Sequence, residues 1–114
     1  MTTIYKICQA ADWAEAQRAG EFRGSAADCA DGYIHFSTAT QVAETAAKHF
    51  ASMSDLVLVA VVAEDLGSAL RWEPSRGGAL FPHLYGALPA AAVRWVKPLR
   101  LDAGGRHVFP ALDR

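Results

Sequence analysis

The sequence predicts a single α+β domain, residues 1–114, with a mainly antiparallel sheet. The length of 114 residues suits one domain, and 52% apolar residues are enough to fill one core. Helical periodicity is confined to the first half of the chain, whereas short strand-like patterns separated by turn signals continue into the second half. Two helices and about six strands are therefore expected.

The first strand and the first helix are expected before residue 21. Thr3–Cys8 predicts a short strand, with the apolar stem of Lys6 lying along one side. Asp12 has a capping-box-like spacing to the acid that follows, so a helix should open there and stop at Gly20, where a glycine suits the C-cap. Glu21–Ala30 is rich in turn signals and is expected to be irregular.

The next strand is expected to run directly into the second helix. Tyr33–Ser37 has the period of two of a strand. Thr38-Ala-Thr-Gln41 predicts a capping box for a helix that runs to about Ser52.

The second half of the chain predicts four further extended segments. Asp55–Ala63 is apolar on both faces, which favours a central strand. Ala69–Glu73 and Leu80–Tyr85 are expected to be extended, and Ala91–Asp102 alternates well enough for a long strand. His107–Phe109 can add a strand at an edge.

Charge and composition narrow the range of partners. The net charge is −1 and the pI about 6.4, so the basic excess that holds nucleic acid by its phosphates is missing. A small-molecule ligand, including an anion, stays open because one or two arginines suffice to bind it.

Cysteine usage and the apolar runs predict a cytoplasmic protein. Cys8 and Cys29 form no metal-binding or redox pair and are expected to be buried thiols in a reducing compartment. The first residues lack the pattern of a signal peptide, and the longest apolar run, Leu56–Ala63, is too short to cross a bilayer.

A first polar stripe is predicted on the strand that precedes the second helix. Ile34 and Phe36 should face the core, which places His35 and Ser37 together on the other face. The helix start at Thr38 favours an anion, so this stripe suits a ribose or a phosphate. The alternative is structural: Thr38 serves only as a cap and His35 is a hydrogen-bonded, partly buried histidine.

A second candidate pair lies on the strand Ala69–Glu73. Arg71 and Glu73 share one face, and Glu73 suits a general base, a hydroxyl-binding group or a stabiliser of positive charge. The alternative is a surface ion pair of Glu73 with Arg71 or Arg76. Arg76 also begins a glycine-containing loop that can close on a phosphate.

The segment Phe81–Gly86 supplies the third candidate surface. If it is extended, Phe81, His83 and Tyr85 share one face and can stack on a flat ring while donating hydrogen bonds. The alternative is a structural turn with Tyr85 filling the core. No dinucleotide-binding glycine motif, phosphate-binding loop, zinc-protease motif or nucleophile elbow occurs. A metal site of His35, His83 and Glu73 is a further alternative, although no spacing fixes it.

Several segments together resemble a known family. The chain contains, in order, IYKI, DGYIHFSTATQVAETAAKHF, LVLVAV, RWE and FPHLYGALP. The combination of G-Y-I-H-x-S and F-P-H-L-Y-G is specific, and it resembles the bacterial domain-of-unknown-function family 952 from about Ile4 to Val96. The resemblance implies a fold similar to the ADP-ribosyltransferase fold, with two helices beside a split, bent and mainly antiparallel sheet.

The same resemblance implies a ligand. In the ADP-ribosyltransferase superfamily NAD lies between the two halves of the sheet, and a His-x-Ser or His-x-Thr strand holds a ribose; His35-Phe36-Ser37 matches that segment. Tyr85 can stand for the aromatic residue that stacks on nicotinamide. The transferase glutamate usually lies on a late strand, whereas only Asp102 and Asp113 follow Glu73 here, a departure that counts against ordinary ADP-ribosyl transfer. The related RNA 2′-phosphotransferases work without that glutamate.

Three functions are therefore weighed. The first is an enzyme that transfers or hydrolyses NAD or an ADP-ribosyl compound, the second a non-catalytic small-ligand-binding module, and the third a metal-dependent enzyme. All three require His35 and His83, which are far apart in the chain, to meet in one cleft. The expected catalytic residues are His35, Glu73 and His83, and the expected ligand-binding residues are Ser37, Thr38, Arg71, Arg76 and Tyr85.

Overall fold

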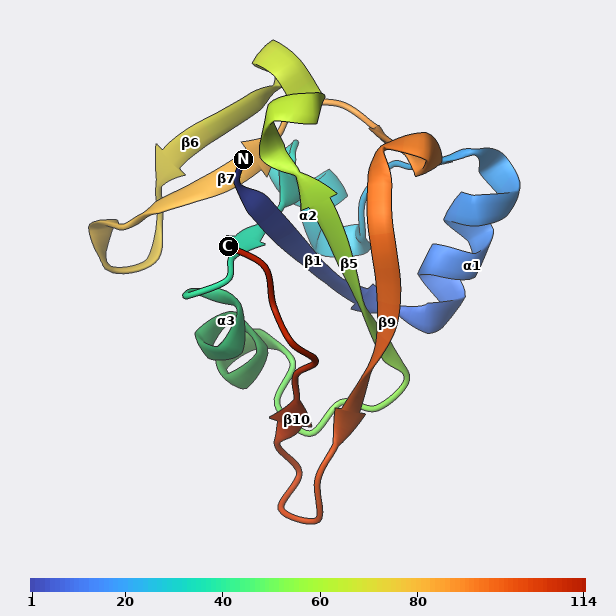
Figure 1. The fold of residues 1–114 in the computed structure, drawn as a ribbon, viewed down its shortest axis with the longest axis vertical. Helices are drawn as coiled ribbons and strands as arrows, with labels where there is room; N and C mark the ends of the chain where they lie inside the picture. The colour runs from blue at the N-terminus through green and yellow to red at the C-terminus, as the bar shows by residue number, and fades with distance from the viewer.

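Strand β5 (Leu56–Val62) runs through the middle of a five-stranded antiparallel sheet (Figure 1). The computed structural model describes residues 1–114. β5 is buried almost throughout, as its continuous apolar sequence predicts, because both faces of the sheet are covered. The strand order is β10-β9-β5-β1-β4. The other strands are β1 (Thr3–Gln9), β4 (Ser37–Thr38), β9 (Val93–Leu101) and β10 (His107–Val108).

Alternation along β5 divides the core into two clusters. Val59 and Val61 pack on one face, and Leu58 and Ala60 pack on the other. Helix α1 (Ala10–Ala19) covers the first face with Trp13 and Ala16, and helix α3 (Val42–His49) covers the second with Val42 and Ala46. α1 stops at Gly20 in the left-handed conformation with φ of 85°, as predicted.

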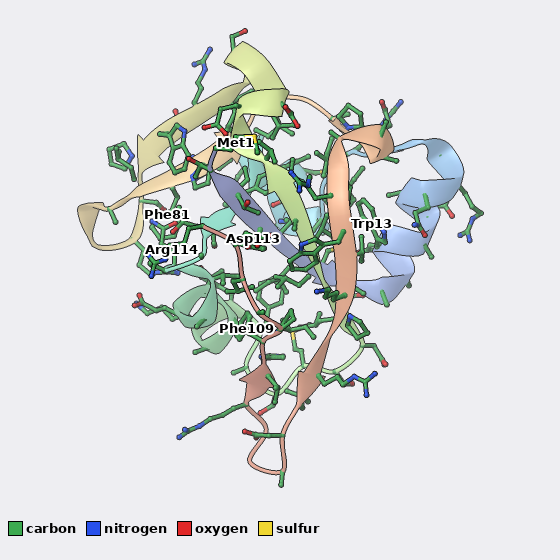
Figure 2. All side chains as sticks on the ribbon, in the orientation of Figure 1. Met1, Trp13, Phe81, Phe109, Asp113 and Arg114 are labelled. Atoms are coloured by element: carbon green, nitrogen blue, oxygen red, sulfur yellow. The ribbon has the colours of Figure 1, made fainter.

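The C-terminal segment closes the face that α3 covers. After β10 the chain runs back over this face (Figure 2), and Phe109 packs against the core cluster beneath it. The Tyr5 hydroxyl donates to the Asp113 carbonyl at 2.7 Å.

A second, three-stranded antiparallel sheet packs beside the large one and carries His35, Arg71, Glu73 and His83. Its order is β3-β7-β6, with β3 at Ile34–His35, β7 at Leu80–Leu84 and β6 at Leu70–Pro74. β2 (Glu21–Phe22) and β8 (Leu88–Pro89) form a separate two-stranded ladder. The result is a small mixed α and β domain with a curled antiparallel sheet and few helices. Short 3-10 turns connect the strands: η1 (Ala63–Ala69), η2 (Arg76–Gly78) and η3 (Ala90–Ala92).

The segment predicted as one strand, Tyr33–Ser37, is two strands in two different sheets. β3 pairs with β7, and β4 pairs with β1. Between them Phe36 is buried and donates its backbone N–H to the Pro82 carbonyl at 3.0 Å. The prediction of a single strand was wrong because its five residues hydrogen-bond to two unrelated partners.

The segment predicted to be irregular, Glu21–Ala30, contains β2 and most of a third helix, α2 (Ala26–Asp31). Ser25 and Asp28 form a complete capping box at the start of α2. This helix is short, and its only buried residue is Asp28. It therefore lacks the apolar periodicity from which a helix is predicted.

The second predicted helix is shorter than expected at both ends. α3 begins at Val42 and ends at His49. Half of the predicted capping box is present, since the Gln41 side chain accepts from the Thr38 N–H at 3.0 Å. The Thr38 hydroxyl contacts Thr40 instead of capping the helix. No helix is both long and apolar enough to span a bilayer.

Candidate functional site

His35 and His83 lie directly opposite each other on β3 and β7, with ring centroids 5.7 Å apart. Arg71 on β6 lies opposite His83 on its other side. Because residues that are paired across strands, and their second neighbours, share one face, Glu73 joins the same surface. The expectation that the two histidines share one site is therefore fulfilled by the strand order of the small sheet.

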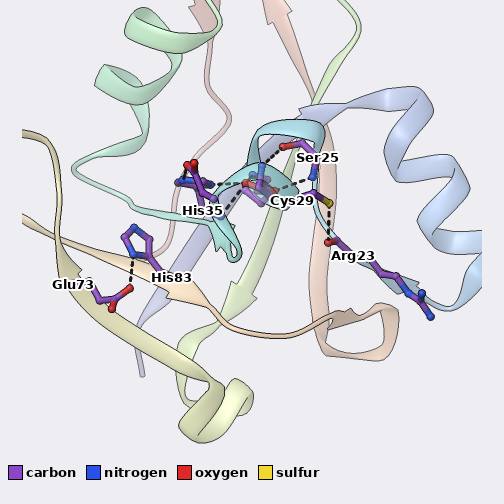
Figure 3. Close-up of polar contacts among 9 residues, drawn as sticks. Arg23, Ser25, Cys29, His35, Glu73 and His83 are labelled. Atoms are coloured by element: carbon purple, nitrogen blue, oxygen red, sulfur yellow. Dashed lines mark hydrogen bonds and ion pairs between the residues drawn. The ribbon is translucent and has the colours of Figure 1, made fainter.

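Glu73 holds both His83 and Tyr85. Nδ1 of His83 lies 2.8 Å from Oε1 of Glu73 (Figure 3), and the Tyr85 hydroxyl donates to the same oxygen at 2.7 Å. The hydrogen bond from His83, followed by that from Tyr85, lowers the pKa of Glu73, whereas donating to the carboxylate raises the pKa of Tyr85. An ionised carboxylate requires the proton on Nδ1, and in the neutral form of His83 this places the lone pair on Nε2. Nε2 has no hydrogen-bond partner within the chain.

Tyr33 completes the surface by stacking on His83. Their ring centroids are 4.1 Å apart with an interplanar angle of 28°, and Tyr33 also lies 4.6 Å from His35 and 5.2 Å from Tyr85. We call these four residues, Tyr33, His35, His83 and Tyr85, the aromatic–histidine cluster. Burial, with the nearby charge of Asp31 and then Glu73, raises the pKa of Tyr33. Tyr33 was not among the predicted site residues, although it shares the alternating face of His35.

Arg71 supplies a cation at the rim of this cluster. Its guanidinium carbon lies 5.0 Å from the centre of the Tyr85 ring, and no carboxylate forms an ion pair with it. A guanidinium that is stacked on an aromatic ring and free of an ion pair remains available to a carboxylate or a phosphate. The predicted ligand-binding residues Arg71 and Tyr85 therefore lie together.

His35 is held between two acids of α2. Its Nδ1 lies 2.6 Å from Asp28 and its Nε2 lies 2.9 Å from Asp31. Both ring nitrogens of His35 are therefore engaged by carboxylates. Neither nitrogen has a free lone pair with which His35 could act as the predicted catalytic base. The geometry instead suits His35 as a residue that positions the cluster.

Asp28 links His35 to the large sheet. Besides His35 and the capping box, it forms a buried ion pair with Lys6 of β1 at 2.7 Å. Burial by itself would raise the pKa of Asp28, but the hydrogen bond from His35 and the charge of Lys6 together hold it well below its usual range. This pair was missed, although a lysine within a strand of otherwise buried sequence is a signal for a buried partner.

Ser37, Thr38 and Arg76 lie away from the cluster. Ser37 is buried against α3, where its hydroxyl lies 2.9 Å from that of Thr45. Arg76 forms an ion pair with Glu44 at 3.0 Å and donates to Thr45 at 3.2 Å. The expectation that His35 and Ser37 share one face was wrong, because the change of sheet at Phe36 sends their side chains to different parts of the molecule.

Sequence comparison identifies the family. The model of a family described as protein of unknown function, DUF952, matches residues 7–96. The chain belongs to the DUF952 family. The resemblance inferred from the motifs is thus confirmed, and no protein with a curated description matches the sequence.

Solved structures of a relative agree with this assignment. The crystal structure of protein CC0527 from Caulobacter crescentus, a structural-genomics target, is 52% identical to this DUF952 chain and superposes with a TM-score of 0.91, covering 94% of each chain. The solution NMR structure of CC0527 is 54% identical over 93% of this chain and 91% of that one, with a TM-score of 0.84. The fold of this chain is therefore shared with a protein whose structure was determined experimentally.

Two further features bear on how a DUF952 site could work. No three His, Cys, Asp or Glu side chains are arranged to hold a metal ion, so the geometry does not support the alternative metal site of His35, His83 and Glu73. A shallow cavity of about 310 Å³ lies beside α2 and reaches Tyr33 but not His83 or Glu73. Tyr33 thus borders this cavity, whereas His83, on which it stacks, is only 3% exposed.

Proposed function

We propose that this chain binds NAD or a related ADP-ribosyl compound at the aromatic–histidine cluster, with His83, oriented by Glu73, as general base in its hydrolysis or transfer. One observation carries the proposal: stacked rings, an oriented imidazole and an unpaired guanidinium lie on one face of one small sheet.

The rings account for affinity toward a flat base. Tyr33 and Tyr85 are partly exposed, and a nicotinamide or adenine ring can extend the stack that Tyr33 forms with His83. Arg71, beside Tyr85, then binds a phosphate of the same ligand by charge-assisted hydrogen bonds.

The Glu73–His83 pair accounts for chemistry. In hydrolysis of NAD, a water molecule bonds to C1′ of the nicotinamide ribose as the C–N glycosidic bond breaks. The bonding pair leaves with nicotinamide, and the proton of the water passes to Nε2 of His83 and then to solvent. In transfer, an acceptor hydroxyl takes the place of water. Glu73 stabilises the charge that His83 gains.

The fold adds support by analogy. The curled antiparallel sheet in two parts, with helices beside it, is compatible with the ADP-ribosyltransferase-like fold that the family resemblance implies. Because one fold can host many unrelated functions, the residues of the cluster carry more weight than the fold.

A second candidate, binding without turnover, is favoured by a different observation. Oε1 of Glu73 already accepts two hydrogen bonds, and the later acid Asp102 accepts from the backbone of Gly104 and Arg106. The carboxylate that would have to stabilise an oxocarbenium-like centre is thus already engaged by two donors, which weakens it for that role.

Thermal unfolding in the presence of NAD, ADP-ribose, AMP or nicotinamide tests both candidates. Binding should raise the unfolding temperature by several degrees with NAD or ADP-ribose. Arg71→Ala should abolish the shift, whereas the matched control Arg76→Ala, which removes an arginine engaged elsewhere, should retain it. No shift with any nucleotide would refute the proposal.

Release of nicotinamide separates the two candidates. Turnover that is lost in His83→Gln while the NAD-induced shift persists would establish the enzyme. A persistent shift without any product would establish the binding module.

A further inference from the structure

Strand β6 is an edge strand that has no partner along one whole side. It is the last strand in the order β3-β7-β6, so only one side of it is hydrogen-bonded, and it lies at the outer margin of the fold (Figure 1). Its five residues, Leu70–Pro74, compare with two each in β3, β4 and β10 at the other edges. Trp72, near the middle of β6, is 41% exposed. Long exposed edges with apolar side chains favour pairing with another strand.

The alternation of hydrogen-bonded and non-hydrogen-bonded pairs between β6 and β7 shows which backbone groups of β6 have no partner. Ser75 donates to the Ala79 carbonyl and Tyr85 donates to the Ala69 carbonyl, so the odd-numbered residues of β6 form the hydrogen-bonded pairs. The backbone N–H and C=O groups of Leu70 and Trp72 therefore point to the open edge. Pro74 presents only a carbonyl there, because proline has no N–H.

We propose that β6 pairs with β6 of a second copy of this chain, antiparallel and with Trp72 opposite Trp72 of the second copy. In this register Trp72 exchanges two hydrogen bonds with its counterpart, and each Leu70 N–H donates to the opposite Pro74 carbonyl. The missing N–H of Pro74 costs one bond at each end, and all outward donors of β6 are still satisfied.

Charge complementarity fixes this register. Pairing centred on residue 72 places Arg71 opposite Glu73 of the second copy, and Glu73 opposite Arg71 of the second copy. These are non-hydrogen-bonded pairs, in which the two Cα atoms are only about 4.5 Å apart. A shift by two residues along the strand removes both opposite-charge pairs, so the sequence Arg-Trp-Glu is complementary to itself only in this register.

The apolar side of the sheet supports the same pairing. Trp72 points away from Arg71 and Glu73, on the face where Leu80 is also 52% exposed. Two-fold pairing brings the two Trp72 side chains together and removes apolar surface from water.

The dimer joins the two candidate sites into one surface. The two-fold axis runs perpendicular to the sheet, so both aromatic–histidine clusters lie on the same face of a continuous six-stranded sheet, with Arg71 of the second copy beside Glu73. In the dimer Arg71 therefore faces Glu73 of the second copy as well as any phosphate bound at the cluster.

The mass in solution tests the proposal. By equilibrium sedimentation the full chain should reach twice its single-chain mass of 12.2 kDa. Trp72→Lys and Trp72→Glu should each raise the dissociation constant at least about tenfold, because like charges then face each other across the axis. An equimolar mixture of these two variants should be heavier than either alone, since Lys and Glu then face each other. Val108→Lys, at the exposed edge strand β10, is the matched control and should leave the dimer intact.

Circular dichroism of each variant establishes that it is folded before its mass is interpreted. A wild-type chain that stays monomeric at every concentration overturns the proposal. So does a dimer that persists unchanged in folded Trp72→Lys, or a mixture of the two Trp72 variants that is no heavier than its components.

Discussion

His83, on the middle strand of the small sheet, places Nδ1 2.8 Å from Oε1 of Glu73, while Glu73 itself remains partly open to solvent. A buried imidazole is thus joined to water through the carboxylate that fixes its tautomer. The same oxygen binds the Tyr85 hydroxyl, so the charge of Glu73 is shared by two donors. Removing either donor should therefore change the pKa of Glu73.

Removing the Tyr85 hydroxyl should raise the pKa of Glu73. Tyr85→Phe deletes one of the two side-chain hydrogen bonds that lower it, with little change in packing. Titration of the Glu73 carboxyl carbon by NMR measures the effect. Tyr33→Phe is the matched control, because the Tyr33 hydroxyl makes no hydrogen bond to Glu73; an equal change in both variants would contradict the assigned role of Tyr85.

Asp28→Asn should destabilise the fold by about 3–5 kcal/mol, because it leaves the buried Lys6 ammonium without a counter-charge. Urea unfolding measures the loss. The control is Asp31→Asn, which removes the other carboxylate on His35 at an exposed position and should cost less than about 1 kcal/mol. Equal losses in the two variants would show that Asp28 acts only through His35.

Acid should destabilise the protein in part through the same residue. The folded pKa of Asp28 lies below its unfolded value of about 3.9, so the unfolded state binds more protons as the pH falls. The stabilising contribution is complete above about pH 5, and it is lost as the pH falls toward the folded pKa. Urea unfolding of the wild type should show a declining free energy in this range, and Asp28→Asn should show a flatter decline. Parallel curves would contradict the assignment.

The two thiols should differ sharply in reactivity. Cys29 is exposed, whereas burial raises the pKa of Cys8 to about 12. Alkylation at neutral pH followed by mass spectrometry should therefore add one label to the native chain and two to the unfolded chain. Cys29→Ser should leave the native chain unlabelled. The expectation of two buried thiols was wrong for Cys29, because the polar helix α2 that carries it could not be recognised from apolar periodicity.

Local sequence patterns predicted the long elements of the fold. The sequence of Leu56–Val62 is apolar throughout, which is typical of a strand that is covered on both faces. This strand lies at the centre of the large sheet, as expected. α2 was not predicted because it has no apolar stripe. A capping box and a buried ion pair stabilise it instead. Such helices depend on partners that are distant in the chain, here Lys6 of β1.

The candidate site was predicted in its composition more than in its geometry. The structure brings Arg71, Glu73, His83 and Tyr85 together, since alternation within one hairpin places them on one face. The approach of His35 was an assumption that only the pairing of β3 with β7 could fulfil. Ser37 was misplaced because alternation within a segment says nothing about which sheet each end joins.

Because the chain passes from one sheet to the other at Phe36, the length of this segment should vary little among related sequences. One residue separates two ladders, β3 on β7 and β4 on β1, so the length of this segment is fixed from both sides. A one-residue insertion or deletion there would turn either His35 away from His83 or Ser37 away from Thr45, since each step along a strand reverses the side-chain direction. The turn between β9 and β10 bears no such constraint, so natural length variation should accumulate there and be purged at Phe36.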